Sequence, residues 1–446
     1  MNFPQHRFST VFSVFAVIFL AVSSQTTFAQ APILTNPTYS YTMLESSQDL
    51  KKTQLLLQER KEGHLPDQGL TIGGALIGIA DFQQSSDDSK FAYLMRHPTS
   101  SNQIGKQVSE AVLHSFQIGL TGTVNSWMAA HAELLYNPEQ SFGSGTITDL
   151  NRNQVQLRKG YILLGDLNKS PWFAALGKMD TPFGQTGSVN PFTNSTMWHA
   201  FGGLAYGAQI GFMKNGLEVT AMAVQGGAQF RAANTPVGDT TSVPSQLNNF
   251  VLDVNYAIDL GSENSLEIGV SYLHGSAYNQ PFPVVHFQPG TFANPAVTGY
   301  GRLEIGKQLV VKGGYAQTLE AWPGTHNPTP PLDVFEASKV SSKDVGLSYT
   351  LNPEASILWT VSGEFSDFRS GPDGAPWERQ NQYALGYSGL FNQSTKLFVE
   401  VFRTEGFAPL NFISGSDDFA PFPPGTTHSK SDVITHGIVI GGQLVF

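Results

Sequence analysis

The sequence predicts an all-β protein, built as a single transmembrane antiparallel β-barrel of about 16 strands and preceded by a short periplasmic helix. Three observations predict this fold. Only 13% of the 446 residues are charged, whereas soluble proteins carry about 25%. Segments of about 10 residues alternate apolar and polar side chains along most of the chain. Short turns and long loops alternate between these segments, which favours a barrel over a soluble β-sandwich.

Residues 1–29 have the pattern of a cleaved secretory signal peptide. His6 and Arg7 form a short basic start, and the apolar stretch from Val11 to Val22 is too short to span a bilayer. Small residues suited to cleavage surround Ala29. Beyond this start no run of about 18 apolar residues occurs, which argues against a helical-bundle membrane protein. With no cysteine, the chain has no lipid attachment site and no disulfide.

Residues 30–69 are predicted to form a periplasmic segment with one short helix. Ser46 and Asp49 are spaced approximately as in a capping box. Leu50, Leu55, Leu56 and Leu57 follow at loosely helical spacing, and Gly63 offers a stop. The pattern leaves several roles open: a linker helix near the barrel mouth, a plug, a coiled-coil tether or an oligomer contact.

Residues 70–446 are predicted to form the barrel. In the segment from Met128 to Tyr136, apolar side chains occupy every second position, while His131 and Glu133 fall on the opposite face. The same alternation of apolar and polar positions repeats to the end of the chain and gives an even number of strands, as expected of a bacterial barrel. Aromatic residues near many strand ends fit the girdles that such barrels place at the membrane interfaces.

The last predicted strand, Val433 to Phe446, has the alternation and terminal aromatic residue that look like the signal used by the barrel assembly machinery. We therefore expect a protein of the bacterial outer membrane, with both termini periplasmic and with outer-membrane lipid and lipopolysaccharide around it. A homo-oligomer is compatible with the sequence pattern, but the pattern identifies no contact between subunits.

Charged side chains are predicted to point into the lumen, where they would tune the selectivity of a water-filled channel. Acids outnumber bases there, which modestly favours cationic or neutral solutes. The loop from Asp180 to Gly203 is the best candidate for a segment folded into the lumen, because it combines aromatic, amide and hydroxyl groups with almost no charge. The candidate pore-lining residues are His131, Glu133, Asn194, Trp198, His199, Asp253, Arg302, Glu304, Lys312, Glu364 and Glu400.

An enzyme, a cofactor or a metal centre is not predicted. The stretch from His131 to Glu133 matches H-x-E, but the zinc deaminase pattern also needs a paired-cysteine motif. Two ligands are too few for a metal site, which needs three or four. No G-x-S-x-G, H-E-x-x-H or P-loop motif occurs. The formal net charge of -10 argues against a nucleic-acid partner.

One extended segment resembles a known family. The stretch from Gly165 to Lys178, continuing into Pro182-Phe183-Gly184 and Asn190 to Thr193, is similar to the LbtU-type siderophore porins. This resemblance implies uptake of an iron–siderophore complex through a barrel without a TonB-type plug. The roughly 40 residues between signal and barrel are too few for the plug of a large TonB-dependent receptor, and a 22-stranded barrel would not fit this length. An acidic lumen would oppose an anionic siderophore.

Three functions therefore compete at this point. The first is a porin selective for an iron–siderophore complex or another small polar solute. The second is a general or differently selective diffusion porin, which would conduct ions in a manner that ferric chelates do not block. The third is a surface adhesin, a structural barrel or an outer-membrane hydrolase, which would conduct little.

Overall fold

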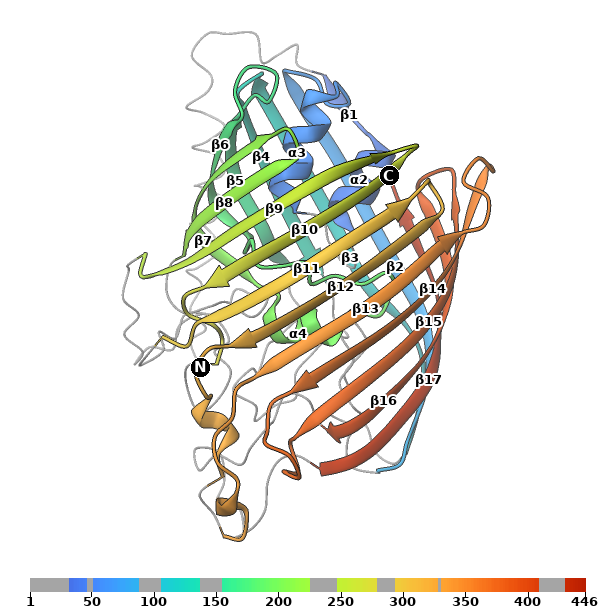
Figure 1. Cartoon of the computed structure of the whole chain (residues 1–446). Helices are drawn as coiled ribbons and strands as arrows, with labels where there is room; N and C mark the ends of the chain where they lie inside the picture. Colours follow the sequence, from blue (N-terminus) through green and yellow to red (C-terminus); the bar gives the residue numbers. More distant parts are fainter. Residues whose placement is uncertain are drawn as a thin grey trace, which may run out of the picture.

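In the computed structural model, sixteen antiparallel strands, β2 to β17, form one closed barrel (Figure 1). Each strand pairs with the next along the chain, and β17 pairs with β2, so the sheet has no free edge. The predicted fold class is confirmed. The structure describes residues 32–45, 51–87, 106–136, 155–224, 247–278, 293–327, 330–408 and 430–446. The predicted signal peptide lies outside these residues.

The strands differ in length, and the longest lie around the closure of the barrel. The first eight are β2 (Gly69–Ser85), β3 (Gln107–Asn125), β4 (Met128–Tyr136), β5 (Gln156–Gly165), β6 (Trp172–Asp180), β7 (Leu204–Lys214), β8 (Leu217–Val224) and β9 (Asn249–Gly261). The other eight are β10 (Asn264–Leu273), β11 (Ala296–Ile305), β12 (Leu309–Thr318), β13 (Ser341–Thr350), β14 (Ile357–Arg369), β15 (Arg379–Phe391), β16 (Thr395–Ala408) and β17 (Lys430–Val445).

Short turns close one end of the barrel, which we call the short-turn end. The turn between β7 and β8 is an example: Asn215 and Gly216 have φ angles of 52° and 81°. Both values are positive, as a two-residue hairpin turn matched to the strand twist requires, and Asn-Gly is the pair that adopts them most readily. Phe446 lies at the same end, where its backbone exchanges hydrogen bonds with Gly74.

Side-chain alternation separates an apolar outer face from the lumen. On β9, Phe250, Leu252 and Val254 are exposed on the outer face, whereas Val251 and Asp253 are buried inside. This is the dyad pattern of a membrane barrel. Among the described residues, no helix is both long enough and apolar enough to cross a bilayer.

The N-terminal segment, residues 32–45 and 51–65, enters the barrel at the short-turn end (Figure 1). It contains β1 (Ile33–Leu34), α2 (Pro37–Leu44) and α3 (Lys52–Lys61). Helix α2 was not predicted, although Asn36 before Pro37 is a helix start signal. The Asn36 side chain accepts a hydrogen bond from the Tyr39 N–H. The predicted capping box lies outside the described residues, and α3 begins only at Lys52.

The interior of the barrel is more apolar than predicted. One buried cluster joins Leu55, Leu56 and Leu57 of α3 to aromatic residues of the wall such as Tyr161 and Phe173. A second cluster contains Ile77, Phe192 and Phe398. Apolar packing between inserted segments and the wall therefore replaces water across much of the lumen.

Candidate pore site

The segment between β6 and β7 folds into the lumen, as the sequence predicted. We call residues 181–203 the lumen loop; it includes the short helix α4 (Thr196–Phe201). Two further short helices, η2 (Pro323–Thr325) and η3 (Leu332–Val334), lie in the segment between β12 and β13. The lumen loop crosses to the opposite wall, because its backbone N–H groups donate to side chains on β10, β14 and β16.

Two buried acids of the wall hold the lumen loop through its backbone. Glu400 accepts hydrogen bonds from the N–H groups of Phe192 and Thr193, at 3.2 and 3.1 Å. Glu364 accepts one from the N–H of Val189 at 3.1 Å. Charged acceptors of this kind make the stronger class of hydrogen bond. Both acids were predicted to line the pore, and the structure places them under the loop.

Glycines on the wall make room for the loop. A Cβ atom added at Gly386 would lie 2.3 Å from Cδ of Pro191, and one added at Gly346 would lie 2.7 Å from Cγ2 of Val189. Real Cβ atoms do not approach other atoms so closely. The wall is therefore shaped, at these two inward positions, to the side chains of Pro191 and Val189 in the loop.

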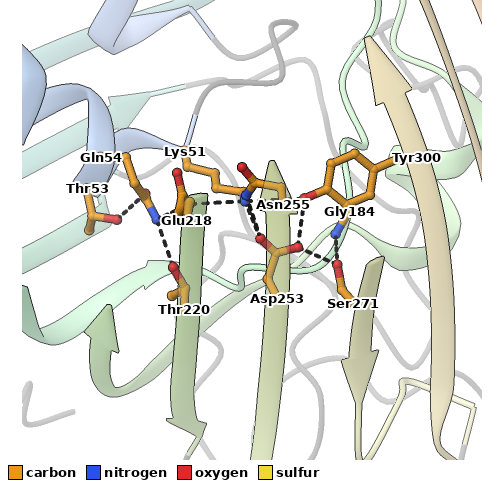
Figure 2. Close-up of polar contacts among 10 residues, drawn as sticks. All are labelled: Lys51, Thr53, Gln54, Gly184, Glu218, Thr220, Asp253, Asn255, Ser271 and Tyr300. Atoms are coloured by element: carbon orange, nitrogen blue, oxygen red, sulfur yellow. Dashed lines mark hydrogen bonds and ion pairs between the residues drawn. The ribbon is translucent and has the colours of Figure 1, made fainter. Parts of the chain in front are cut away.

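The N-terminal segment is held by a polar cluster around Asp253 (Figure 2). Lys51 Nζ lies 2.5 Å from Asp253 Oδ2 and 3.2 Å from Glu218 Oε1. Asp253 is fully buried and also accepts hydrogen bonds from Ser271 at 2.6 Å and Tyr300 at 2.8 Å. Burial alone would lower the pKa of Lys51, but Glu218 and Asp253 outweigh that effect and raise it above its usual value.

Lys52, the next residue of the N-terminal segment, has a different electrostatic environment. Lys52 is buried, and its ammonium group donates to the carbonyl oxygens of Thr42 at 2.5 Å and Glu45 at 2.9 Å. Burial, and after it the charge of Lys159, lowers the pKa of Lys52 to about 7. Burial therefore brings the titration of Lys52 down from the alkaline range to near neutral pH.

The remaining predicted site residues occupy three environments. On the wall near α2, His131 Nδ1 lies 2.9 Å from Thr121 Oγ1, and Glu133 forms a 2.9 Å ion pair with Arg158. In the lumen loop, Asn194 and His199 are buried and Trp198 is partly buried. The His199 ring packs edge-on against Phe368.

On the wall of β11 to β13, two predicted bases are paired. Lys312 forms a buried 2.8 Å ion pair with Asp344 and also donates to the carbonyl of Gly187 in the lumen loop. Arg302 forms a 2.8 Å ion pair with Glu304, and both side chains remain partly exposed. Among the described residues, no group of three histidine or acidic side chains could hold a metal ion.

A cavity of about 340 Å³ separates the two inserted segments from the wall of β11 to β16. Tyr41 of α2 and residues 188–191 of the lumen loop form one side of it. Arg302 and Lys396 are its basic lining residues, and none of the described residues that line it is acidic. Its aliphatic hydroxyl groups come from Ser188, Ser348, Thr350, Thr360, Ser362 and Ser388, and Tyr41 adds a phenol hydroxyl.

The polar residues that sequence reasoning missed are those that join the inserted segments to the wall. Lys51, Glu45 and Lys396 are the main ones. Alternation places Lys396 inside, since it lies two positions from Phe398 and four from Glu400 on β16. No periodic signal identifies Lys51 or Glu45, because both lie outside the strands.

Comparison with known proteins gives similarity of structure only. No family model and no curated protein matches the chain. Pseudomonas putida OprB, in its high-pH structure, is 9% identical, with a TM-score of 0.52 over 89% of this chain and 96% of that one. The anion-selective porin from Comamonas acidovorans is 13% identical, with a TM-score of 0.48 over 85% and 99%. Outer-membrane-expressed OmpT of Vibrio cholerae is 11% identical, with a TM-score of 0.47 over 86% and 99%.

At these identities the likeness concerns the fold alone. The similarity to OprB covers 89% of this chain. It agrees with the strand pairing described above. The chain has a barrel of the porin type.

Proposed function

We propose that this protein is a pore of the bacterial outer membrane that passes small polar solutes. The observation that carries the proposal is the cavity beside the lumen loop, within a closed barrel whose outer face is apolar. Barrels of 16 to 18 strands are wide enough to enclose an aqueous channel. Here the lumen loop and the N-terminal segment narrow that channel, which favours a selective pore over a general one.

The lining of the cavity favours hydroxyl-rich or anionic solutes, although both of its basic side chains are paired, Arg302 with Glu304 and Lys396 with Glu45. The acids that the sequence placed in the lumen are largely engaged: Asp253 binds Lys51, while Glu364 and Glu400 bind the backbone of the loop. The polar lining of the cavity consists of two paired basic side chains, the amide of Asn190, the phenol of Tyr41 and six serine or threonine hydroxyl groups. The predicted excess of acids in the lumen therefore does not determine the selectivity of the pore. Because these carboxylates are paired, they repel an anionic solute less than the sequence suggested.

Within this function, we propose an iron–siderophore complex as the solute. Two observations support it: the resemblance of residues 165–178 to the siderophore porins, and a cavity lined by donors without carboxylates. The cavity is at the small end of the range for ligand pockets, about 300–1,000 Å³. A bulky chelate therefore needs more room than the cavity offers.

We include the eleven predicted site residues in this proposal, in three roles. Arg302 acts on the solute with Glu304 as its ion-pair partner, whereas Asp253, Lys312, Glu364 and Glu400 position the inserted segments. His131, Glu133, Asn194, Trp198 and His199 belong to the packed walls of the channel. We also propose a signal peptide over residues 1–29, periplasmic termini, contact with lipopolysaccharide, recognition by the barrel assembly machinery and formation of a homo-oligomer. We propose no enzymatic activity.

Uptake of radiolabelled ferric siderophore by a deletion strain, with and without the gene restored, tests the solute. Lost uptake that returns on complementation is the expected result. Normal uptake by the deletion strain, together with ohmic conductance of the purified protein that ferric chelates do not block, would instead indicate a general porin. Negligible conductance would indicate a surface role.

A further inference from the structure

The N-terminal segment spans the inside of the barrel and reaches walls on different sides. Tyr39 of α2 bonds to Thr121 of β3, and Glu45 pairs with Lys396 of β16. Lys51, just before α3, pairs with acids of β8 and β9. In Figure 1, α2 and α3 lie within the ring of strands near the short-turn end. A segment in contact with so many strands of a closed barrel obstructs its lumen.

We propose that this segment is a resident plug, and that solutes larger than the cavity pass only when it is displaced. The inference rests on the proposed pore function. The plug is defined as residues 32–45 and 51–65. Two buried ionic anchors hold it, one at Lys51 and one at Glu45, and these anchors decide how often the pore is open.

Two glycines of the wall leave room for the plug. A Cβ atom at Gly73 of β2 would lie 2.1 Å from Oγ of Ser40, and one at Gly119 of β3 would lie 3.0 Å from Cδ2 of Leu44. Any larger side chain at Gly73 would collide with α2. Both glycines occupy inward positions, where alternation otherwise places polar side chains such as Thr71 and Thr121. The shape of the wall thus matches a seated plug.

The contacts that hold the plug are of a kind that can be broken without unfolding the barrel. Within the described residues, its backbone joins the sheet only through the two-residue strand β1, at the start of β2. Elsewhere its contacts run through side chains. Lys51 and Gln54 bond to Glu218 (Figure 2). Arg60 bonds to the carbonyl oxygens of Asn125 and Gly165. Displacement would leave every strand of the barrel paired with its neighbours.

A reversible covalent lock tests this inference directly. The chain has no cysteine, so a double variant S40C and G73C contains one pair of thiols. Cβ of Ser40 lies 2.7 Å from the position of a Cβ atom at residue 73. A disulfide needs about 3.5–4.5 Å between Cβ atoms, so a shift of about 1 Å accommodates it.

The measurement is single-channel conductance in a planar bilayer, in potassium chloride. We expect the reduced double variant to show full-conductance openings, the oxidised form to lose them, and reductant to restore them. The single variants S40C and G73C are the controls, because neither can form the bond; G73C should open more often than S40C, since its side chain meets α2. Full-conductance openings of the oxidised form, with the disulfide verified by mass spectrometry, would overturn the plug.

A second variant tests the anchor without cysteines. The double substitution D253N and E218Q removes both acids from Lys51, and we expect a several-fold rise in the fraction of time spent open. The matched control is E354Q, which breaks an exposed 2.9 Å ion pair with Lys307 in the turns. An unchanged open fraction in D253N/E218Q would count against the plug. If no form carries current, including a chain lacking residues 32–65, the proposed pore function is wrong, and the proposed plug is then wrong as well.

Discussion

Lys396 on β16 forms a buried ion pair with Glu45 at the end of α2, with 2.7 Å between Nζ and Oε2. The same ammonium group donates to the carbonyl oxygen of Pro191 in the lumen loop at 3.0 Å. One lysine therefore joins the wall, the N-terminal segment and the loop, which are far apart in the sequence. These contacts couple the two segments that narrow the channel.

Replacing Lys396 with methionine should destabilise the protein, because Glu45 is then a buried charge without its partner. Breaking one side of a buried pair costs about 3–5 kcal/mol. Urea unfolding in detergent would measure the loss, and the double variant K396M/E45Q should recover part of it. The control K307M breaks an exposed, solvent-screened pair and should change stability far less than K396M does. Equal effects of K396M and K307M would contradict the role of Lys396.

Replacing Glu400 with alanine should release the lumen loop. Two buried N–H groups, of Phe192 and Thr193, then lose their acceptor, at about 1–3 kcal/mol each. We expect larger and noisier single-channel currents, and a smaller change in E400Q, which keeps one acceptor oxygen. E405Q is the control on the same strand, since Glu405 pairs with Arg403 on the outer face. Quiet currents of wild-type size in E400A would show that the loop is held by other contacts.

Replacing Gly386 with alanine should displace the lumen loop by overpacking. The new methyl group would meet Pro191 and the hydroxyl of Ser362. Overpacking of this kind costs about 1–3 kcal/mol. G299A is the matched control, because nothing lies within 4 Å of a Cβ atom there. Thermal unfolding followed by circular dichroism should separate the two variants, and identical melting temperatures would refute the fit between glycine and loop.

Replacing Arg302 with glutamine should shift the ion selectivity of the pore toward cations. The substitution removes one of the two basic groups of the cavity and leaves Glu304 without its 2.8 Å partner. The reversal potential in a salt gradient measures the change. K169Q is the control, because Lys169 pairs with Asp166 in a short turn between β5 and β6. An anion-ward shift, or none, would mean that solutes do not pass Arg302.

The charge of Lys52 predicts a dependence on pH. Its pKa in the folded protein is about 7, below its ordinary value of 10.5. Between these two values the unfolded chain binds more protons at this residue than the folded one, so its contribution to stability rises with pH. The melting temperature of the wild type, relative to K52M, should increase from about pH 7 to pH 10. A constant difference would indicate that Lys52 has the same pKa in both states.

The barrel could be predicted from sequence because its causes are local and repeated. The side chains of β4 and β9 alternate with a period of two, and Asn215-Gly216 adopts the positive φ angles of a tight hairpin. These patterns determine which face meets lipid. Composition rather than alternation indicated the lumen loop as the segment that folds inward, because that segment combines aromatic, amide and hydroxyl groups with almost no charge.

The roles of the lumen residues could not be predicted in this way. Alternation places Asp253, Glu364 and Glu400 inside, but it does not say what they meet there. Their partners are Lys51 and the backbone of residues 189–193, which belong to other parts of the chain. The sequence thus determined the barrel and its two faces, since each strand carries its own pattern of burial. Only the tertiary structure decided which charges remain available to a solute, because closure of the barrel brings distant segments into one lumen.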